Sequence, residues 1–146
     1  MRWQMIDKIL ECAPGLSAVG EKIFPPEEPL FLDHFPGFPI VPGVLQIEMM
    51  AQLAGKCAAL SKTGILPVLG SVKNARFYHN VHPGERCLIK VQVLKVAKSY
   101  IVAEGEIEVN GKKASSASIL FGVVERSKLS SDDFDSVSQD WLERQS

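Results

Sequence analysis

Apolar and polar residues alternate over most of the chain, and this alternation predicts β-strands. Two short strands are expected before a proline-rich stretch and four longer ones after it, at residues 4–11, 16–24, 68–78, 86–97, 99–109 and 113–124. The first two flank a turn at Ala13-Pro14-Gly15, and the last two flank Asn110-Gly111, whose residues tolerate the positive φ of a type I′ turn. The pattern therefore predicts an antiparallel sheet.

One segment, residues 43–60, breaks the alternation and predicts a helix. Twelve of its eighteen residues are apolar and surround the helical wheel, so the sheet must enclose a helix about 27 Å long. It is too polar for an ordinary membrane span, since it carries Gln46, Glu48, Gln52 and Lys56. These patterns predict an α+β domain over residues 1–125. A tail over residues 126–146 follows, in which a short final helix would carry Phe134, Val137 and Trp141 on one side.

The composition excludes several classes of protein. The 146 residues are 46% apolar and 23% charged with a net charge of −1, which is ordinary for a soluble globular protein and unlike a disordered or nucleic-acid-binding one. Cys12, Cys57 and Cys87 lack the spacing of zinc or redox motifs, so we expect reduced, mostly buried thiols and neither a metal nor a cofactor. The first residues contain no apolar stretch suitable for a signal peptide, which favours the cytoplasm.

A narrow polar stripe interrupts the apolar surface of the predicted helix. Glu48 and Gln52 are four residues apart, and Gly55 lies on the same line. Because an unpaired buried carboxylate is costly, Glu48 should have hydrogen-bond partners, stay protonated or border a cavity. All three suit a catalytic acid, whereas a structural role at a dimer seam or on a wetter helix surface is the alternative.

The loop before this helix holds a histidine among three prolines, Pro36, Pro39 and Pro42. Prolines restrict the backbone, so the loop can hold the His34 imidazole in place at little entropic cost on substrate binding. The helix opens at Gly43, where free N–H groups and the helix dipole favour an oxyanion and glycine allows a substrate to come close. His34, Gly43 and Glu48 thus predict a base, an oxyanion donor and an acid, whereas His79 and His82 are expected to be solvated or structural.

The segment HFPGFPIVPGVLQIEMMAQ, residues 34–52, closely resembles the signature of FabZ-type (3R)-hydroxyacyl-[acyl-carrier-protein] dehydratases. It contains the histidine, the Pro-Gly helix start, the glutamate fourteen positions after the histidine (48 minus 34) and the glutamine four positions later. The segment VKNARFYHNVHPGERCLIKVQVLK resembles the family's next strands, so the likeness extends from about residue 4 to about residue 124. The resemblance implies a hot-dog fold, with an antiparallel sheet wrapped around one long buried helix.

The same resemblance implies roles for individual residues. His34 would remove the C2 proton, the Gly43 N–H would polarise the thioester carbonyl, and Glu48, oriented by Gln52, would protonate the departing C3 hydroxyl. His34 would face Glu48 of another copy, in a homodimer or trimer of dimers with active sites at the subunit interface, so that a monomer would be inactive. The acyl chain would lie in a tunnel beside the helix, lined by Phe35, Phe38, Val44 and Phe77.

The chain departs from the family pattern in three places. It begins almost at the first strand, Asp33 replaces the usual glycine before the histidine, and Tyr78-His79-Asn80 replaces a more basic stretch that relatives use near the carrier protein. The added carboxylate would favour the protonated form of His34 or perturb the loop.

Several alternatives stay open within the same fold. They are a hydratase or thioesterase acting on acyl-coenzyme A, a dehydratase of a specialised pathway such as polyene synthesis, and a non-catalytic acyl-binding subunit. The preserved spacing is that of dehydratases, which disfavours the thioesterase. Four cations suit the phosphate of a carrier arm and that of a nucleotide equally well: Lys22, Lys73, Arg76 and Arg86.

Overall fold

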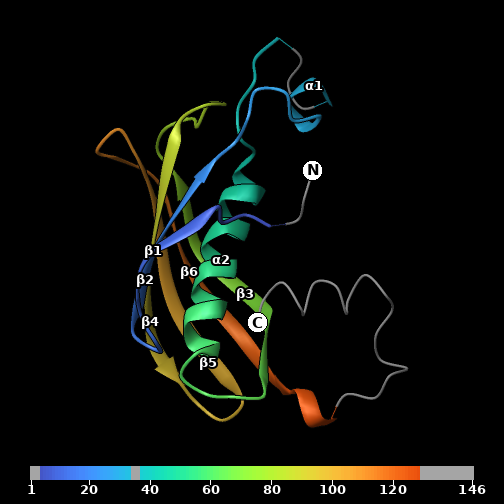
Figure 1. Cartoon of the computed structure of the whole chain (residues 1–146), viewed down its shortest axis with the longest axis vertical. Coiled ribbons are helices and arrows are strands. Elements are labelled where there is room, and N and C mark those ends of the chain that lie inside the picture. The colour runs from blue at the N-terminus through green and yellow to red at the C-terminus, as the bar shows by residue number, and fades with distance from the viewer. Residues whose placement is uncertain (1–3, 34–36, 129–146) are drawn as a thin grey trace.

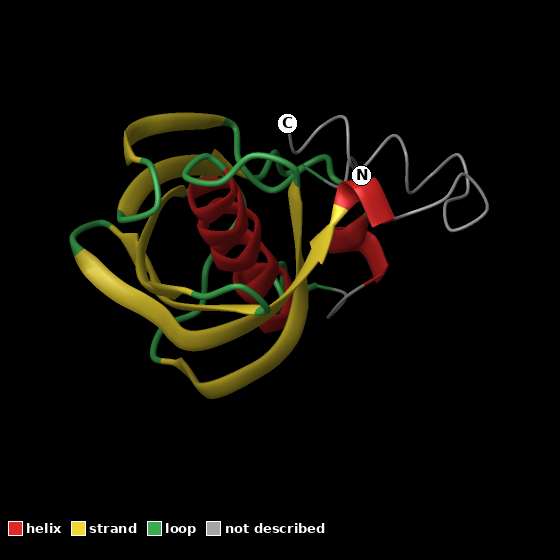
Figure 2. Cartoon of the chain, turned by 90° about the horizontal axis from the view of Figure 1, so that it is seen from below, coloured by secondary structure: helices red, strands yellow, loops and turns green. Residues whose placement is uncertain are grey.

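A computed structural model of the chain describes residues 4–33 and 37–128, and its centre is a single helix enclosed by one sheet (Figures 1 and 2). The six strands are antiparallel neighbours in the order β1-β2-β4-β5-β6-β3. They are β1 Lys8–Ala13, β2 Ser17–Ile23, β3 Ile65–Phe77, β4 Arg86–Val96, β5 Tyr100–Val109 and β6 Lys112–Glu125. The helices are α1 Leu30–Asp33, α2 Gly43–Ala59 and the 3-10 turn η1 Arg126–Lys128. The predicted hot-dog fold is confirmed.

The hydrophobic core lies between α2 and the concave face of the sheet, which curves around the helix in Figure 2. Met49, Met50 and Leu53 of α2 are fully buried, and they belong to one cluster with Ile89 of β4 and Ile107 of β5. Each such side chain contributes about 1.5–3 kcal/mol when it leaves water. The helix is therefore held by the sheet, as its apolar circumference predicts.

The strand β3 forms one edge of the sheet. It pairs with β6 alone, and no described strand pairs with its other side. Two irregularities interrupt the pairing, between Leu69 and Ser71 and between Lys73 and Arg76. An edge strand presents unpaired N–H and C=O groups, which makes it a ready partner for a strand of another chain.

The structure corrects several predicted boundaries. The first strand begins at Lys8 instead of residue 4, because Met5 and Ile6 are buried in the core outside the sheet. The third strand begins at residue 65 instead of 68 and contains Pro67, which is tolerated on an edge strand. The proline-rich stretch contains the short helix α1, which the sequence did not predict. The C-terminal helix lies outside the described residues, and the division of the chain at residue 125 stays a prediction.

Two of the three cysteines are buried, in line with the expectation that they are mostly buried. They are Cys57 and Cys87, and burial raises the pKa of the Cys87 thiol to about 12, whereas Cys12 is exposed. Within residues 4–33 and 37–128, no cluster of three or more His, Cys, Asp or Glu side chains could hold a metal ion. No helix in these ranges is both long and apolar enough to cross a membrane.

Close packing between α2 and β5 leads to a stability prediction. A Cβ added at Gly105 would lie 2.9 Å from the Cβ of Met50, so Gly105→Ala should lower the free energy of unfolding by about 1–3 kcal/mol. Gly122→Ala is the matched control, because the nearest atom to an added Cβ there is 3.9 Å away. Urea unfolding followed by circular dichroism measures both variants. Equal stability of the two variants would contradict the packing described for α2 and β5.

Candidate active site

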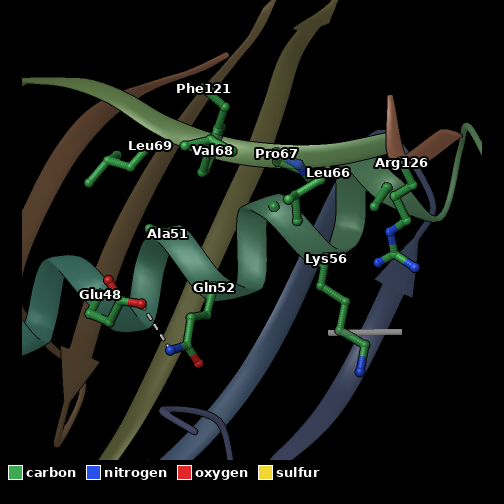
Figure 3. Close-up of a pocket in the computed structure, with 12 residues that line it drawn as sticks. Glu48, Ala51, Gln52, Lys56, Leu66, Pro67, Val68, Leu69, Phe121 and Arg126 are labelled. Atoms are coloured by element: carbon green, nitrogen blue, oxygen red, sulfur yellow. Dashed lines mark hydrogen bonds between the residues drawn. The ribbon is translucent and has the colours of Figure 1, made fainter. Parts of the chain in front are cut away.

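The two polar side chains of the stripe on α2, Glu48 and Gln52, are hydrogen-bonded to each other. The Nε2 of Gln52 donates to the Glu48 Oε1 at 2.9 Å, and the backbone N–H of Met5 donates to the Gln52 Oε1 at 2.9 Å (Figure 3). Gln52 is buried and Glu48 is half-buried. The side-chain amide of Gln52 is thus fixed on both sides, and it holds one oxygen of the Glu48 carboxylate in place.

The carboxylate of Glu48 borders a groove of about 280 Å³ between α2 and the first half of β3 (Figure 3). Ala51, Gly55 and Ala59 recur every four residues on α2, and their small size leaves the room. The lining is Glu48, Ala51, Gln52, Gly55, Lys56, Ala59, Leu66, Pro67, Val68, Leu69, Phe121 and Arg126. Two of the three predicted settings for Glu48, a hydrogen-bond partner and a cavity, are therefore present.

Gly43 begins α2, and Pro42 provides the N-cap. The Pro42 carbonyl accepts the N–H groups of Leu45 and Gln46, whereas the Gly43 N–H has no acceptor among the described residues. A Cβ at Gly43 would lie 2.8 Å from the Cε1 of Phe77. The ring of Phe77 thus packs beside the Gly43 Cα, and this close contact favours glycine at the position. The expected approach of a substrate to the Gly43 N–H stays a prediction.

The other predicted site residues do not converge on this groove. Phe38, Val44 and Phe77 are exposed, and none of the three lines it. The Phe38 ring packs edge-to-face against His82, with the centroids 6.5 Å apart. His34 and Phe35 lie outside the described residues.

Two of the four candidate phosphate-binding cations are already neutralised. Lys22 pairs with Asp7 at 3.1 Å. Arg86 pairs with Glu21 at 3.1 Å and, as the main cause, holds the pKa of that carboxyl below its usual range. The remaining two cations, Lys73 and Arg76, are exposed on β3.

A second hollow of about 580 Å³ lies over the polar face of the strands β2 to β6. It includes Arg76 but none of the predicted catalytic or acyl-binding residues. The groove beside Glu48 is therefore the candidate active site.

Three groups at this site were not predicted from the sequence. They are the Met5 backbone N–H, which holds Gln52, and the cations Lys56 and Arg126, which line the groove. Lys56 continues the four-residue spacing of Glu48 and Gln52, so extending the polar stripe by one more helical turn predicts it. Met5 and Arg126 come from distant parts of the chain, and only the fold brings them to α2.

Comparison with known families identifies the class of protein. Residues 1–118 match the model of the FabA-like domain. This match covers most of the chain, so the protein belongs to the FabA-like family.

Within that family, the chain is similar to curated proteins named 3-hydroxyacyl-[acyl-carrier-protein] dehydratase FabZ. The relative from Clostridium acetobutylicum is 42% identical over 122 residues, which are 82% of this chain and 86% of the relative. The relative from Chloroflexus aggregans is 38% identical over 127 residues, or 85% and 88% of the two chains.

Solved structures support the fold alone, because their sequence identities are low. The smu.793 protein of Streptococcus mutans, bound to acetyl-CoA, matches with a TM-score of 0.68 at 13% identity, over 86% of this chain and 93% of that one. The dehydratase heterocomplex ApeI:P of Xenorhabdus doucetiae matches with a TM-score of 0.63 at 21% identity, over 79% and 96%.

The two buried glutamines of α2 provide a matched test of the polar stripe. Gln52→Met removes the hydrogen bonds to Glu48 and to the buried Met5 N–H, so we expect a loss of about 1–3 kcal/mol in the free energy of unfolding. Gln46→Met should cost less. Gln46 donates one bond of 3.2 Å to Val41 O, and its buried Oε1 has no partner among the described residues. Urea titrations measure the difference, and an equal or larger loss for Gln46→Met would contradict this account.

Proposed function

We propose that the chain removes water from (3R)-hydroxyacyl thioesters on an acyl carrier protein, yielding trans-2-enoyl thioesters for fatty acid or related acyl-chain synthesis. The observation that carries the proposal is the Glu48 carboxylate, held by Gln52 beside a largely apolar groove. Membership in the FabA-like family and the similarity to FabZ relatives support the same reaction.

The reaction needs a base, an acid and a stabiliser of negative charge. We assign the base to His34, which takes the C2 proton, while the electron pair of that C–H bond forms the C2=C3 double bond. Glu48 donates a proton to the C3 hydroxyl, which leaves as water when the C3–O bond breaks. The Gly43 N–H at the start of α2 donates to the thioester oxygen, where negative charge develops.

The groove gives the acyl chain a place to lie. Ala51, Gly55 and Ala59 form its floor on α2, and Leu66, Pro67, Val68, Leu69 and Phe121 cover it from the sheet side. Burial of methylene groups against these side chains contributes about 0.8 kcal/mol per CH₂. Gln52 acts in this proposal as a positioning residue that keeps Glu48 directed to the reacting carbons.

We assign His34 and Glu48 of one site to two copies of the chain. The open edge of β3 supports a homodimer whose sheets join, since Val68 and Leu69 on that strand are 45% and 47% exposed. Val44, on the largely buried helix α2, is 71% exposed and is a candidate for the same interface. We also propose that such dimers can assemble as a trimer of dimers and that the protein acts in the cytoplasm.

Turnover of defined substrates tests this function. The purified chain is incubated with (3R)-3-hydroxyacyl thioesters on carrier protein and on coenzyme A, while enoyl absorbance reports dehydration and free thiol reports hydrolysis. Loss of the base or the acid should lower kcat at least about 100-fold in His34→Ala and Glu48→Gln. Gln52→Met should lower kcat more than it changes KM, and Glu104→Gln, on the exposed face of β5, should match the wild type.

Three results would contradict the proposal. They are thiol release without enoyl formation, a lack of enoyl product on either carrier, and full activity of Glu48→Gln. The first would favour a thioesterase, and the second would favour a non-catalytic acyl-binding subunit.

A further inference from the structure

Two cations lie at the end of the groove that is farthest from Glu48. Lys56 lies eight residues after Glu48 on α2, which is about 12 Å along the helix axis. Arg126 belongs to η1, directly after β6. Glu48, Lys56 and Arg126 all line the groove, and Figure 3 shows Glu48 on one side of the view and Lys56 and Arg126 on the other.

Neither cation has an acidic partner within residues 4–33 and 37–128. The Nε of Arg126 is buried and has no hydrogen-bond acceptor among these residues. Other half-buried cations of the chain are paired, such as Lys22 with Asp7 and Lys90 with Glu108. A buried donor without an acceptor is costly, so a ligand that brings an acceptor to the Arg126 Nε would be favoured in this groove.

The space between the carboxylate and the cations is largely apolar, although Gln52 also lines it. Gly55 lies on α2 directly before Lys56, where an added Cβ would lie 3.7 Å from both Phe121 and Pro67. A methyl-ended chain would fit this part of the groove, but its end would displace water from an ammonium and a guanidinium without replacing the lost hydrogen bonds. An anionic end would supply those bonds, and the apolar walls would strengthen the attraction.

We propose that Lys56 and Arg126 form an anion site that selects thioester substrates carrying a negative group about 12 Å from the carbons at Glu48. The proposal rests on the proposed dehydratase function of Glu48. The ligand chemistry is a carboxylate or phosphate oxygen with two possible sources. One is a carboxylate at the far end of the acyl chain. The other is a phosphate in the arm that carries the thioester, in which case the arm lies in the groove instead of the acyl chain.

Substrates without phosphate separate the two sources. N-acetylcysteamine thioesters of two 3-hydroxyacyl chains of equal length are compared, one ending in a carboxylate and one in a methyl group. If the acyl end is bound, the wild type prefers the carboxylate by about tenfold or more in kcat/KM, and Lys56→Met and Arg126→Met remove this preference. If the arm is bound, the two chains react equally. Both variants then lower kcat/KM for the coenzyme A thioester about tenfold relative to the N-acetylcysteamine thioester.

Lys62→Met is the matched control. Lys62 is an exposed lysine just beyond the end of α2 and does not line the groove, so its loss removes the same charge nearby without touching the site. The ratios of kcat/KM should stay at the wild-type value in this variant. If Lys56→Met and Arg126→Met change both ratios no more than Lys62→Met does, the anion site is overturned.

A direct measurement of ligand binding tests the anion site even if the protein does not catalyse the proposed dehydration. A wild type that converts no hydroxyacyl thioester would refute the dehydratase. Octanedioate, octanoate and inorganic phosphate are then titrated into ¹⁵N-labelled protein. Shifts of the Gly55 and Leu66 amides with octanedioate or phosphate, absent with octanoate and lost in Lys56→Met, support the site. The absence of such shifts overturns it.

Discussion

The hydrogen-bonded chain from the Met5 N–H through Gln52 to Glu48 is the interaction on which the site depends. The sheet encloses most of α2, so polar groups on this helix must find partners inside the fold or border a cavity. The two hydrogen bonds of Gln52 satisfy that requirement. They involve only the Oε1 atom of Glu48, so they leave its Oε2 atom available to a ligand. A carboxylate that is fixed on one side and next to a groove on the other is well placed to exchange a proton with a ligand.

The groove follows from the choice of small residues on one line of α2. The short side chains of Ala51 and Ala59, and the absence of one at Gly55, leave space where α2 faces β3. Larger side chains fill the core on the opposite side of the helix. One side of α2 thus packs into the core, and the side with the small residues leaves a channel along the helix. The channel has unlike ends, a carboxylate and a pair of cations, and this polarity gives a bound molecule a preferred direction.

The sequence predicted the architecture well because the fold follows from two periodicities. The alternating strands and the helix that is apolar all round define a sheet wrapped around α2, and the Asn110-Gly111 turn, where both φ angles are positive, joins β5 to β6 as expected. The residues at which strands and helices begin and end were less predictable. Met5 leaves the line of the first strand because its backbone is needed at Gln52, a contact across 47 residues that no local pattern contains.

The site was predicted in part. The Glu48 to Gln52 hydrogen bond follows from helical spacing, whereas the wall made by β3 and the position of Arg126 depend on which strands become neighbours. The resemblance implied Phe38, Val44 and Phe77 as residues lining the acyl tunnel. In the single chain they are exposed and lie outside the groove, so their contact with an acyl chain stays a prediction.

Mixing two inactive variants tests most directly whether the acid and the base come from two copies of the chain. His34→Ala and Glu48→Gln are coexpressed with different tags, and mixed dimers are verified by native mass spectrometry. In a mixed dimer, His34 of one copy meets Glu48 of the other at one of the two sites. Random pairing should therefore restore about a quarter of the wild-type activity. A mixture that contains mixed dimers but stays as inactive as its parents would contradict the account.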